Sequence, residues 1–186
     1  INSKFILIAG LVITAYSVFM MSEFNLYVDY NAVAVTRLIM GLGMGLVFIP
    51  LTTMAFATIK KEEMGNATSI YNLVRNLAGS IGIAVMTTLL ARRAQFHQFR
   101  FSERLNPFDA RYQMGLEKAT TVLQAKTGAA DHMAAKGLIY QELMKQSTLF
   151  SFIDAFYFAT AIMLCIIPLV FLLKKPKHGQ KAIMGH

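Results

Sequence analysis

The chain has 186 residues, of which 55% are hydrophobic and only 15% are charged, and its formal net charge is +8. An ordinary soluble domain carries roughly 25% charged residues to cover its surface. The composition therefore argues against that class and favours a protein that faces lipid. The single cysteine, Cys165, excludes an internal disulfide framework and a multi-cysteine metal site.

The basic residues lie between the apolar stretches and not on one amphipathic face. This distribution favours a role at a membrane surface over nucleic-acid binding, so the predicted partner is the lipid bilayer. The chain starts at Ile1 with no basic stretch ahead of a cleavage site, so we expect no signal peptide and interpret the sequence as a piece of a longer polypeptide.

Four apolar stretches are long enough to cross a bilayer. A helix rises 1.5 Å per residue, so about 20 apolar residues cross the hydrocarbon core. Helix is the expected conformation, because lipid offers no hydrogen-bond partners to the backbone. The sequence predicts an all-α membrane protein with three spans within residues 1–91 and a fourth after a long loop. The predicted spans are about 5–22, 32–59, 64–91 and 147–173.

The charges between the spans predict the orientation. The loop between the first two spans has no Lys or Arg, whereas the tight turn after the second contains Lys60 and Lys61, and residues 174–186 form a basic tail. Short basic loops stay on the cytoplasmic side. We therefore expect the turn and the C-terminus in the cytoplasm and the long loop on the opposite, outer side of the membrane.

The outer loop, residues 92–146, is predicted to form a helical hairpin. Asn106 and Pro107 break the helix that continues from the third span. Asp109 can cap a second helix and Gly128 can end it. A third helical stretch then leads into the fourth span. The loop is either simply solvated or a docking surface for another protein.

The third span carries a stripe of polar and small residues at helical spacing, which includes Asn72, Arg75, Asn76, Gly79 and Gly82. A membrane helix turns such a stripe toward protein or a water-filled cavity. Arg75 lies near mid-membrane, where a charge costs about 2.5–3.5 kcal/mol on insertion scales. It is interpreted either as a functional residue with a partner or as a structural lock between helices.

Two further charged residues lie inside spans. Arg37 in the second span is followed by Gly41 and Gly45, a spacing that lets a neighbouring helix approach closely. Arg37 either extends to the outer interface or takes part in proton transfer. Asp154 lies near the outer end of the fourth span, and an acid there is a candidate proton site that can also simply stay hydrated.

Enzyme signatures are missing from the sequence. No zinc-protease motif or phosphate-binding loop occurs, and the glycines at 41, 43 and 45 lie inside an apolar helix. The four histidines have no metal-ligand spacing. The sequence therefore predicts a protein that is not an enzyme, with no catalytic residues, no cofactor and no metal.

Several of these stretches together resemble the 14-span drug:proton antiporters of the major facilitator superfamily, in particular the EmrB-type multidrug exporters. The stretches that carry the resemblance are residues 37–45, 50–53, 65–69, 72–82 and, in the outer loop, 103–108.

The resemblance implies that the chain is the C-terminal third of such an exporter, with spans eleven to fourteen forming four of the six helices of the C-terminal half-bundle. It implies exchange of protons for small amphipathic drugs by alternating access, and work with a periplasmic adaptor and an outer-membrane channel. It places Arg75 and the pair Asn72 and Asn76 at the transport cavity. Arg37 would match an arginine repeated in both halves.

Two alternatives stay open: a major facilitator transporter of one metabolite, and a membrane scaffold without transport activity. Within the bundle, the sequence predicts that the third span faces the pathway or a buried seam. The first span, which has no charge between Phe5 and Ser22, is predicted to be mainly lipid-facing.

Overall fold

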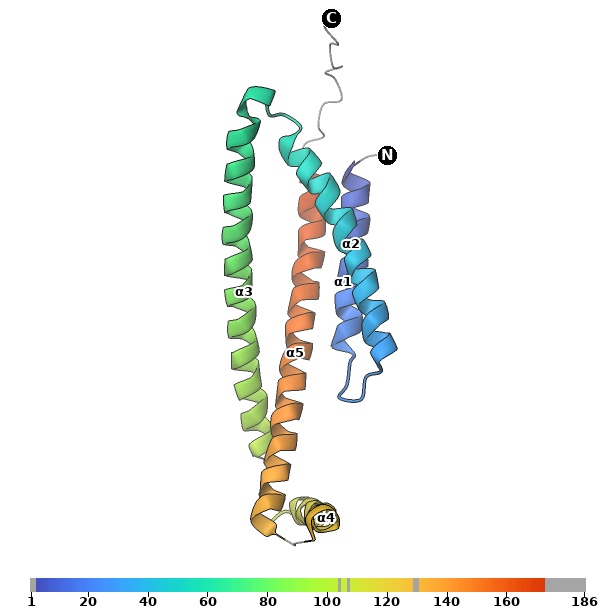
Figure 1. The fold of residues 1–186 in the computed structure, drawn as a ribbon, viewed down its shortest axis with the longest axis vertical. Helices are drawn as coiled ribbons and strands as arrows, with labels where there is room; N and C mark the ends of the chain where they lie inside the picture. Colours follow the sequence, from blue (N-terminus) through green and yellow to red (C-terminus); the bar gives the residue numbers. More distant parts are fainter. Residues whose placement is uncertain (1–2, 104, 107, 129–130, 173–186) are drawn as a thin grey trace, which may run out of the picture. The chain divides into compact units, whose positions relative to one another are not determined.

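The fold is described here from a computed structural model that covers residues 3–103, 105–106, 108–128 and 131–172. Among these residues every regular element is helical and no strand occurs, which confirms the predicted all-α class (Figure 1). The helices are α1 (Ser3–Ser22), α2 (Tyr30–Phe56), the short 3₁₀ helix η1 (Lys61–Glu63), α3 (Met64–Ser102), α4 (Ala110–Thr127) and α5 (His132–Leu172).

Helices α1, α2, α3 and α5 are long and apolar enough to cross a membrane, as predicted. Helices α3 and α5 contain 39 and 41 residues, about twice what the hydrocarbon core requires. Each is therefore a continuous helix that is longer than one crossing needs. The limits of the four spans within these helices stay predictions, and the basic tail, residues 174–186, lies outside the described residues.

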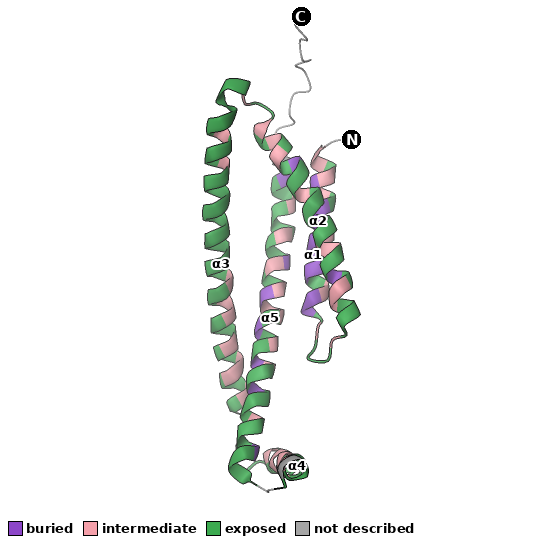
Figure 2. Ribbon diagram, in the orientation of Figure 1, coloured by how far each residue is buried: buried purple, intermediate pink, exposed green. Residues whose placement is uncertain are grey.

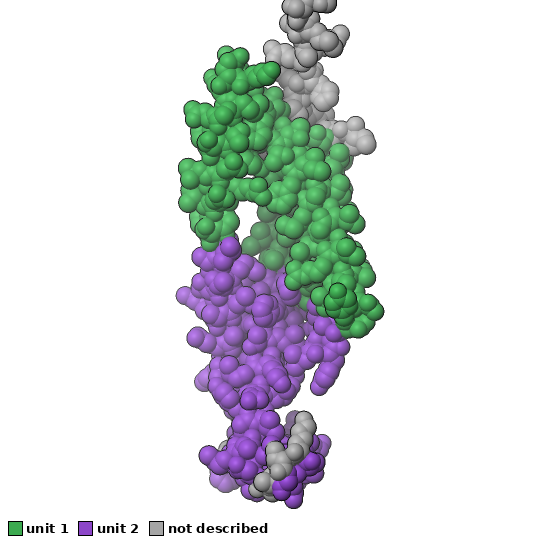
Figure 3. All heavy atoms as spheres, in the orientation of Figure 1, with its two compact units in different colours: residues 1–21, 29–81, 157–186 green, residues 22–28, 82–156 purple. Residues whose placement is uncertain are grey.

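The chain forms two compact units (Figure 3). The first comprises the described parts of residues 1–21, 29–81 and 157–186, and the second comprises those of residues 22–28 and 82–156. The first unit thus holds α1, α2 and parts of α3 and α5. The second holds α4 and the other parts of the two long helices.

In the first unit, small residues bring α1 and α2 into close contact. A Cβ atom at Gly10 would lie 2.9 Å from the carbonyl oxygen of Gly43, and one at Gly43 would collide with the Thr14 hydroxyl. The buried Ser17 hydroxyl donates a 2.6 Å hydrogen bond to the Thr36 carbonyl across the same seam. Backbone approach of this kind replaces the hydrophobic driving force that is missing between helices in lipid.

The core of the first unit lies between α1 and α5. Leu7, Leu11 and Val170 are buried together, and the Phe19 and Tyr157 rings meet edge to face with centroids 6.1 Å apart. Half of the most apolar 18-residue window of α1 is buried within the chain (Figure 2). The predicted lipid-facing role of the first span is therefore wrong, because its small residues pack against neighbours although it carries no charge.

Helix α3, which carries the polar stripe, is exposed where α1 is buried. It has no buried residue, and none of its most apolar window is covered within the chain (Figure 2). In the first unit it meets α2 through the rings of Tyr71 and Phe56, whose centroids lie 5.2 Å apart. Most of its surface is left for lipid, solvent or other parts of the protein.

In the second unit, local capping rules define α4. The Asp109 side chain accepts a 2.8 Å hydrogen bond from the Arg111 amide, which confirms the predicted cap at the start of the helix. Gly128 ends the helix in the left-handed conformation with φ of 76°, also as predicted. The predicted break at Asn106 and Pro107 falls between α3 and α4, although Pro107 itself lies outside the described residues.

Candidate functional site

The polar stripe of α3 is the first candidate site. Asn72, Arg75 and Asn76 are all exposed in the first unit. The Arg75 guanidinium lies over the Phe48 ring of α2, 5.2 Å from its centroid. Such a cation–π contact is worth about 0.5–2 kcal/mol, which only partly offsets the cost of a charge in lipid. Among the described residues, Arg75 makes no ion pair.

The other predicted residues of α2 and α3 are also exposed. Arg37 is exposed on α2, next to the buried Thr36. No atom of the described chain would lie within 4 Å of a Cβ at Gly41, Gly45, Gly79 or Gly82. The contact between α1 and α2 uses Gly10 and Gly43 instead. The packing role of the four open glycines stays a prediction.

The second candidate site is a cluster of three charged or titratable side chains in the second unit. The His97 Nε2 of α3 lies 2.7 Å from the Asp154 Oδ2 of α5, and the Arg93 Nε lies 3.6 Å from the same oxygen. The side chains of His97 and Asp154 are 16% and 29% exposed, so both are largely shielded while still reachable by solvent. The structure thus pairs Asp154, the predicted acid, with two basic residues.

Aromatic rings surround the histidine. The His97 ring lies 5.5 Å from the centroids of both Phe96 and Phe150 and 6.1 Å from that of Phe101. Phe101 and Phe150 also pack edge to face, 5.5 Å apart. These apolar neighbours leave the imidazole few orientations and lower the local dielectric, which strengthens its polar contact with Asp154.

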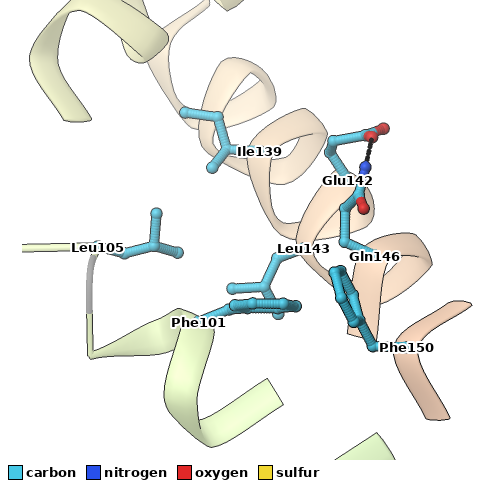
Figure 4. Close-up of a pocket in the computed structure, with 7 residues that line it drawn as sticks. All are labelled: Phe101, Leu105, Ile139, Glu142, Leu143, Gln146 and Phe150. Atoms are coloured by element: carbon cyan, nitrogen blue, oxygen red, sulfur yellow. Dashed lines mark hydrogen bonds between the residues drawn. The ribbon is translucent and has the colours of Figure 1, made fainter. Parts of the chain in front are cut away.

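Two of these rings line an apolar groove between α3 and α5, with a cavity volume of about 450 Å³ (Figure 4). The side chains of Glu142 and Gln146, joined by a 3.3 Å hydrogen bond, are the polar members of its wall. The lining residues are Phe101, Leu105, Ile139, Glu142, Leu143, Gln146 and Phe150.

Sequence reasoning identified Asp154 but missed Arg93 and His97. The two basic residues are four positions apart and therefore share one face of α3. This spacing, just beyond the end of an apolar stretch, is the signal that could have singled them out. Their partner is 57 residues from His97 in the sequence, so nothing local indicated it.

The described residues contain no group of three or more His, Cys, Asp or Glu side chains that could hold a metal ion. One imidazole and one carboxylate fall short of the ligand set that a structural or catalytic metal usually needs. The arrangement is an ion-pair and hydrogen-bond contact between α3 and α5.

Comparison with known proteins gives one family. The family model described as Major Facilitator Superfamily matches residues 1–93, half of the chain. No solved structure matches the chain.

Several curated relatives match most of the chain. The fatty acid resistance protein FarB of Neisseria gonorrhoeae is 26% identical over 96% of this chain and 34% of its own length. The multidrug export protein EmrB of Escherichia coli K12 is 30% identical over 80% of this chain and 28% of its own length. The colistin resistance protein EmrB of Acinetobacter baumannii is 23% identical over 83% of this chain and 30% of its own length.

The chain thus spans about a third of the length of the relatives it matches. Together with the four long apolar helices, these similarities indicate a multi-pass bacterial inner-membrane protein that resembles EmrB-type transporters. The chain belongs to the Major Facilitator Superfamily.

Proposed function

We propose that the chain is the C-terminal part of a proton-driven multidrug efflux transporter that works by alternating access. The similarity to proteins named for multidrug export and for resistance to colistin and fatty acids supports export of small amphipathic compounds. In this proposal it supplies the last four of fourteen spans. Because the chain covers about a third of those relatives, it would need the rest of the protein to transport.

The observation that carries the proposal is the environment of Arg75. It is a permanently charged side chain in the apolar part of α3, with one aromatic contact and no carboxylate partner in the described chain. A charge at that depth needs a partner or water. Both are available in a transport cavity between the two halves of such a protein. In this proposal Asn72 and Asn76 line or brace the cavity beside Arg75.

Other residues have supporting roles in the proposal. The open faces at Gly41, Gly45, Gly79 and Gly82 would pack against helices supplied by the rest of the transporter. Arg37, exposed on the outer part of α2, and Asp154 would contribute to proton coupling. The outer segment of α3, α4 and α5 would contact a periplasmic adaptor that leads to an outer-membrane channel.

Efflux of ethidium by cells that produce the full-length transporter tests this function. We expect cells loaded with ethidium to lose its fluorescence when energised and to stop losing it as soon as an uncoupler collapses the proton gradient. The matched control is the same strain with the gene absent, treated identically. Export that continues after the gradient has collapsed would exclude proton-driven antiport.

A further inference from the structure

We propose that His97 and Asp154 form a proton-binding site that links α3 to α5 at the outer face of the inner membrane. Acid strengthens the contact between these two side chains. The inference deepens the proposed function, because it names the place where a proton from the outer side first binds. The geometry that supports it is the 2.7 Å contact between His97 Nε2 and Asp154 Oδ2.

The site lies where the apolar stretches of both helices end. On α3, no charged residue occurs between Arg75 and Arg92, and Arg93 and His97 follow directly. On α5, Asp154 precedes a stretch without charge that runs to Leu172. A charged cluster at this boundary has contact with water on one side and apolar surroundings on the other, as proton entry requires.

The protonation chemistry follows from the contact. An ionised carboxylate can only accept hydrogen bonds, so Nε2 of His97 carries the hydrogen that points at Asp154. The additional proton then binds at Nδ1 and turns the ring into an imidazolium. The hydrogen bond from Nε2 becomes charge-assisted, and such bonds are roughly twice as strong as neutral ones. Acid on the outer side therefore holds α3 and α5 together more firmly.

The other charged groups nearby do not replace this pair. Arg93 faces Asp154 from α3 and stays charged at all relevant pH values, so it balances the carboxylate without responding to acid. Arg100, one turn beyond His97, is directed to Glu103 at 3.9 Å. Arg92 is exposed.

On α5 itself, the next charged residues toward the start of the helix are Glu142 and Lys145, which pair with each other at 3.9 Å. The phenol of Tyr140 accepts a hydrogen bond from Gln98 at 3.4 Å. The ring of Tyr157 packs on Phe19. Histidine is the side chain that ordinarily changes charge between pH 5 and 8, and His97 is the histidine that contacts Asp154.

Distances between spin labels in the full-length transporter test the proposal without drug or proton gradient. The labels replace the exposed residues Gln95 on α3 and Thr148 on α5, in a protein where the exposed Cys165 and any other native cysteine are changed to serine. We expect the distance distribution to become shorter and narrower between pH 8 and pH 5.5. Rocking of two rigid halves leaves this distance unchanged, because both labels lie in the same half.

The variants separate proton binding from a merely structural contact. H97Q and D154N should lose the acid-induced shift. The control R100Q removes the contacts of Arg100 with Glu103 and with the Phe96 ring but leaves the pair intact, so it should keep the shift. The exchange H97D/D154H restores the pair in reverse and should recover the shift. An unchanged response in both single variants, or no response in the parent, overturns the proposal. Either result leaves uncoupler-sensitive efflux, and hence the proposed function, to be judged separately.

Discussion

At the residue scale, the charge of Arg75 has one aromatic contact and no ion pair among the described residues. The ring of Phe48 provides about 0.5–2 kcal/mol, against an insertion cost of about 2.5–3.5 kcal/mol. The side chain is retained in an exposed position on a helix that has no buried residue. This imbalance is typical of a residue that works in a hydrated cavity or pairs across an interface.

We therefore predict that R75A in the full-length transporter lowers the initial rate of ethidium efflux by about tenfold or more, which corresponds to a loss of about 1.4 kcal/mol. R75K, which keeps the charge but not the planar guanidinium, should retain part of the rate. The control is R92A, at an exposed position further along α3. Normal efflux by R75A at matched protein levels would contradict a role of Arg75 in transport and leave it a structural role or none.

Gly43 permits a second prediction at this scale. A Cβ atom there would collide with the Thr14 hydroxyl and lie 2.9 Å from the Thr14 amide nitrogen. Since the backbones cannot separate without losing the adjacent contact at Gly10, G43A should destabilise the protein by about 1–3 kcal/mol. Thermal unfolding of the purified full-length protein measures this as a lower melting temperature.

The matched control for Gly43 is Gly137, a helical glycine of α5 with no atom within 4 Å of its Cβ position. G137A should leave the melting temperature unchanged or raise it, because alanine favours the helix by about 1 kcal/mol. Equal melting temperatures for G43A and G137A would show that α1 and α2 are not in close contact at Gly43.

The residues that sequence reasoning located correctly obey local rules. Asp109 and Gly128 were predicted because a cap depends on atoms within two or three positions along the chain. The partners of Asp154 depend instead on which face of α3 meets α5, which no local pattern encodes. The contact at Gly43 was likewise not predicted, because the glycine spacing within α2 does not indicate which face meets α1.

At the element scale, α1 and α3 show why charge alone is a poor guide to burial in a membrane protein. Half of the most apolar window of α1 is buried although Lys4 is the only charged residue of that helix, and none of the corresponding window of the polar-striped α3 is buried. Apolar side chains are as stable against lipid as against another helix, so hydrophobicity does not drive two helices together. Small residues that permit close packing therefore distinguish a packed helix from a lipid-facing one. Gly10, Thr14 and Ser17 on one face of α1 were the signal for packing.

Helix α4 permits a prediction for a whole element. It joins two long helices outside the apolar stretches and depends on its caps, the Asp109 carboxylate and the left-handed Gly128. D109A should cost about 1 kcal/mol, and G128A should cost about 1–2 kcal/mol because its Cβ disfavours positive φ. Hydrogen exchange of the α4 amides should speed up accordingly in both variants.

The conservative change D109N serves as the control for α4, because asparagine caps helices about as well as aspartate. It should leave the exchange rates close to those of the parent. If D109A exchanges no faster than D109N, then contacts other than the cap hold α4.

At the scale of the whole molecule, the exposed faces indicate what the chain lacks. Among the described residues, no atom outside the same helix lies close to the Cβ positions of Gly41, Gly45 and Gly79 in the first unit or of Gly82 in the second. Helix α3 has no buried residue. Helices that cross a membrane bury such faces against other helices. In the proposed arrangement these neighbours come from the other spans of the transporter, consistent with a chain about a third as long as its relatives.

The orientation of the chain is the last prediction, and it follows from the distribution of charge. The turn with Lys60 and Lys61 is short and basic, so it belongs on the cytoplasmic side, whereas the long segment that contains α4 can cross regardless of its charge. In a C165S background, a membrane-impermeant maleimide should label E117C in intact spheroplasts and should label E62C only after lysis. Both glutamates are exposed, so accessibility of the side chain does not bias the comparison. Labelling of E62C before lysis would reverse the topology, and with it the outer position assigned to the His97 and Asp154 pair.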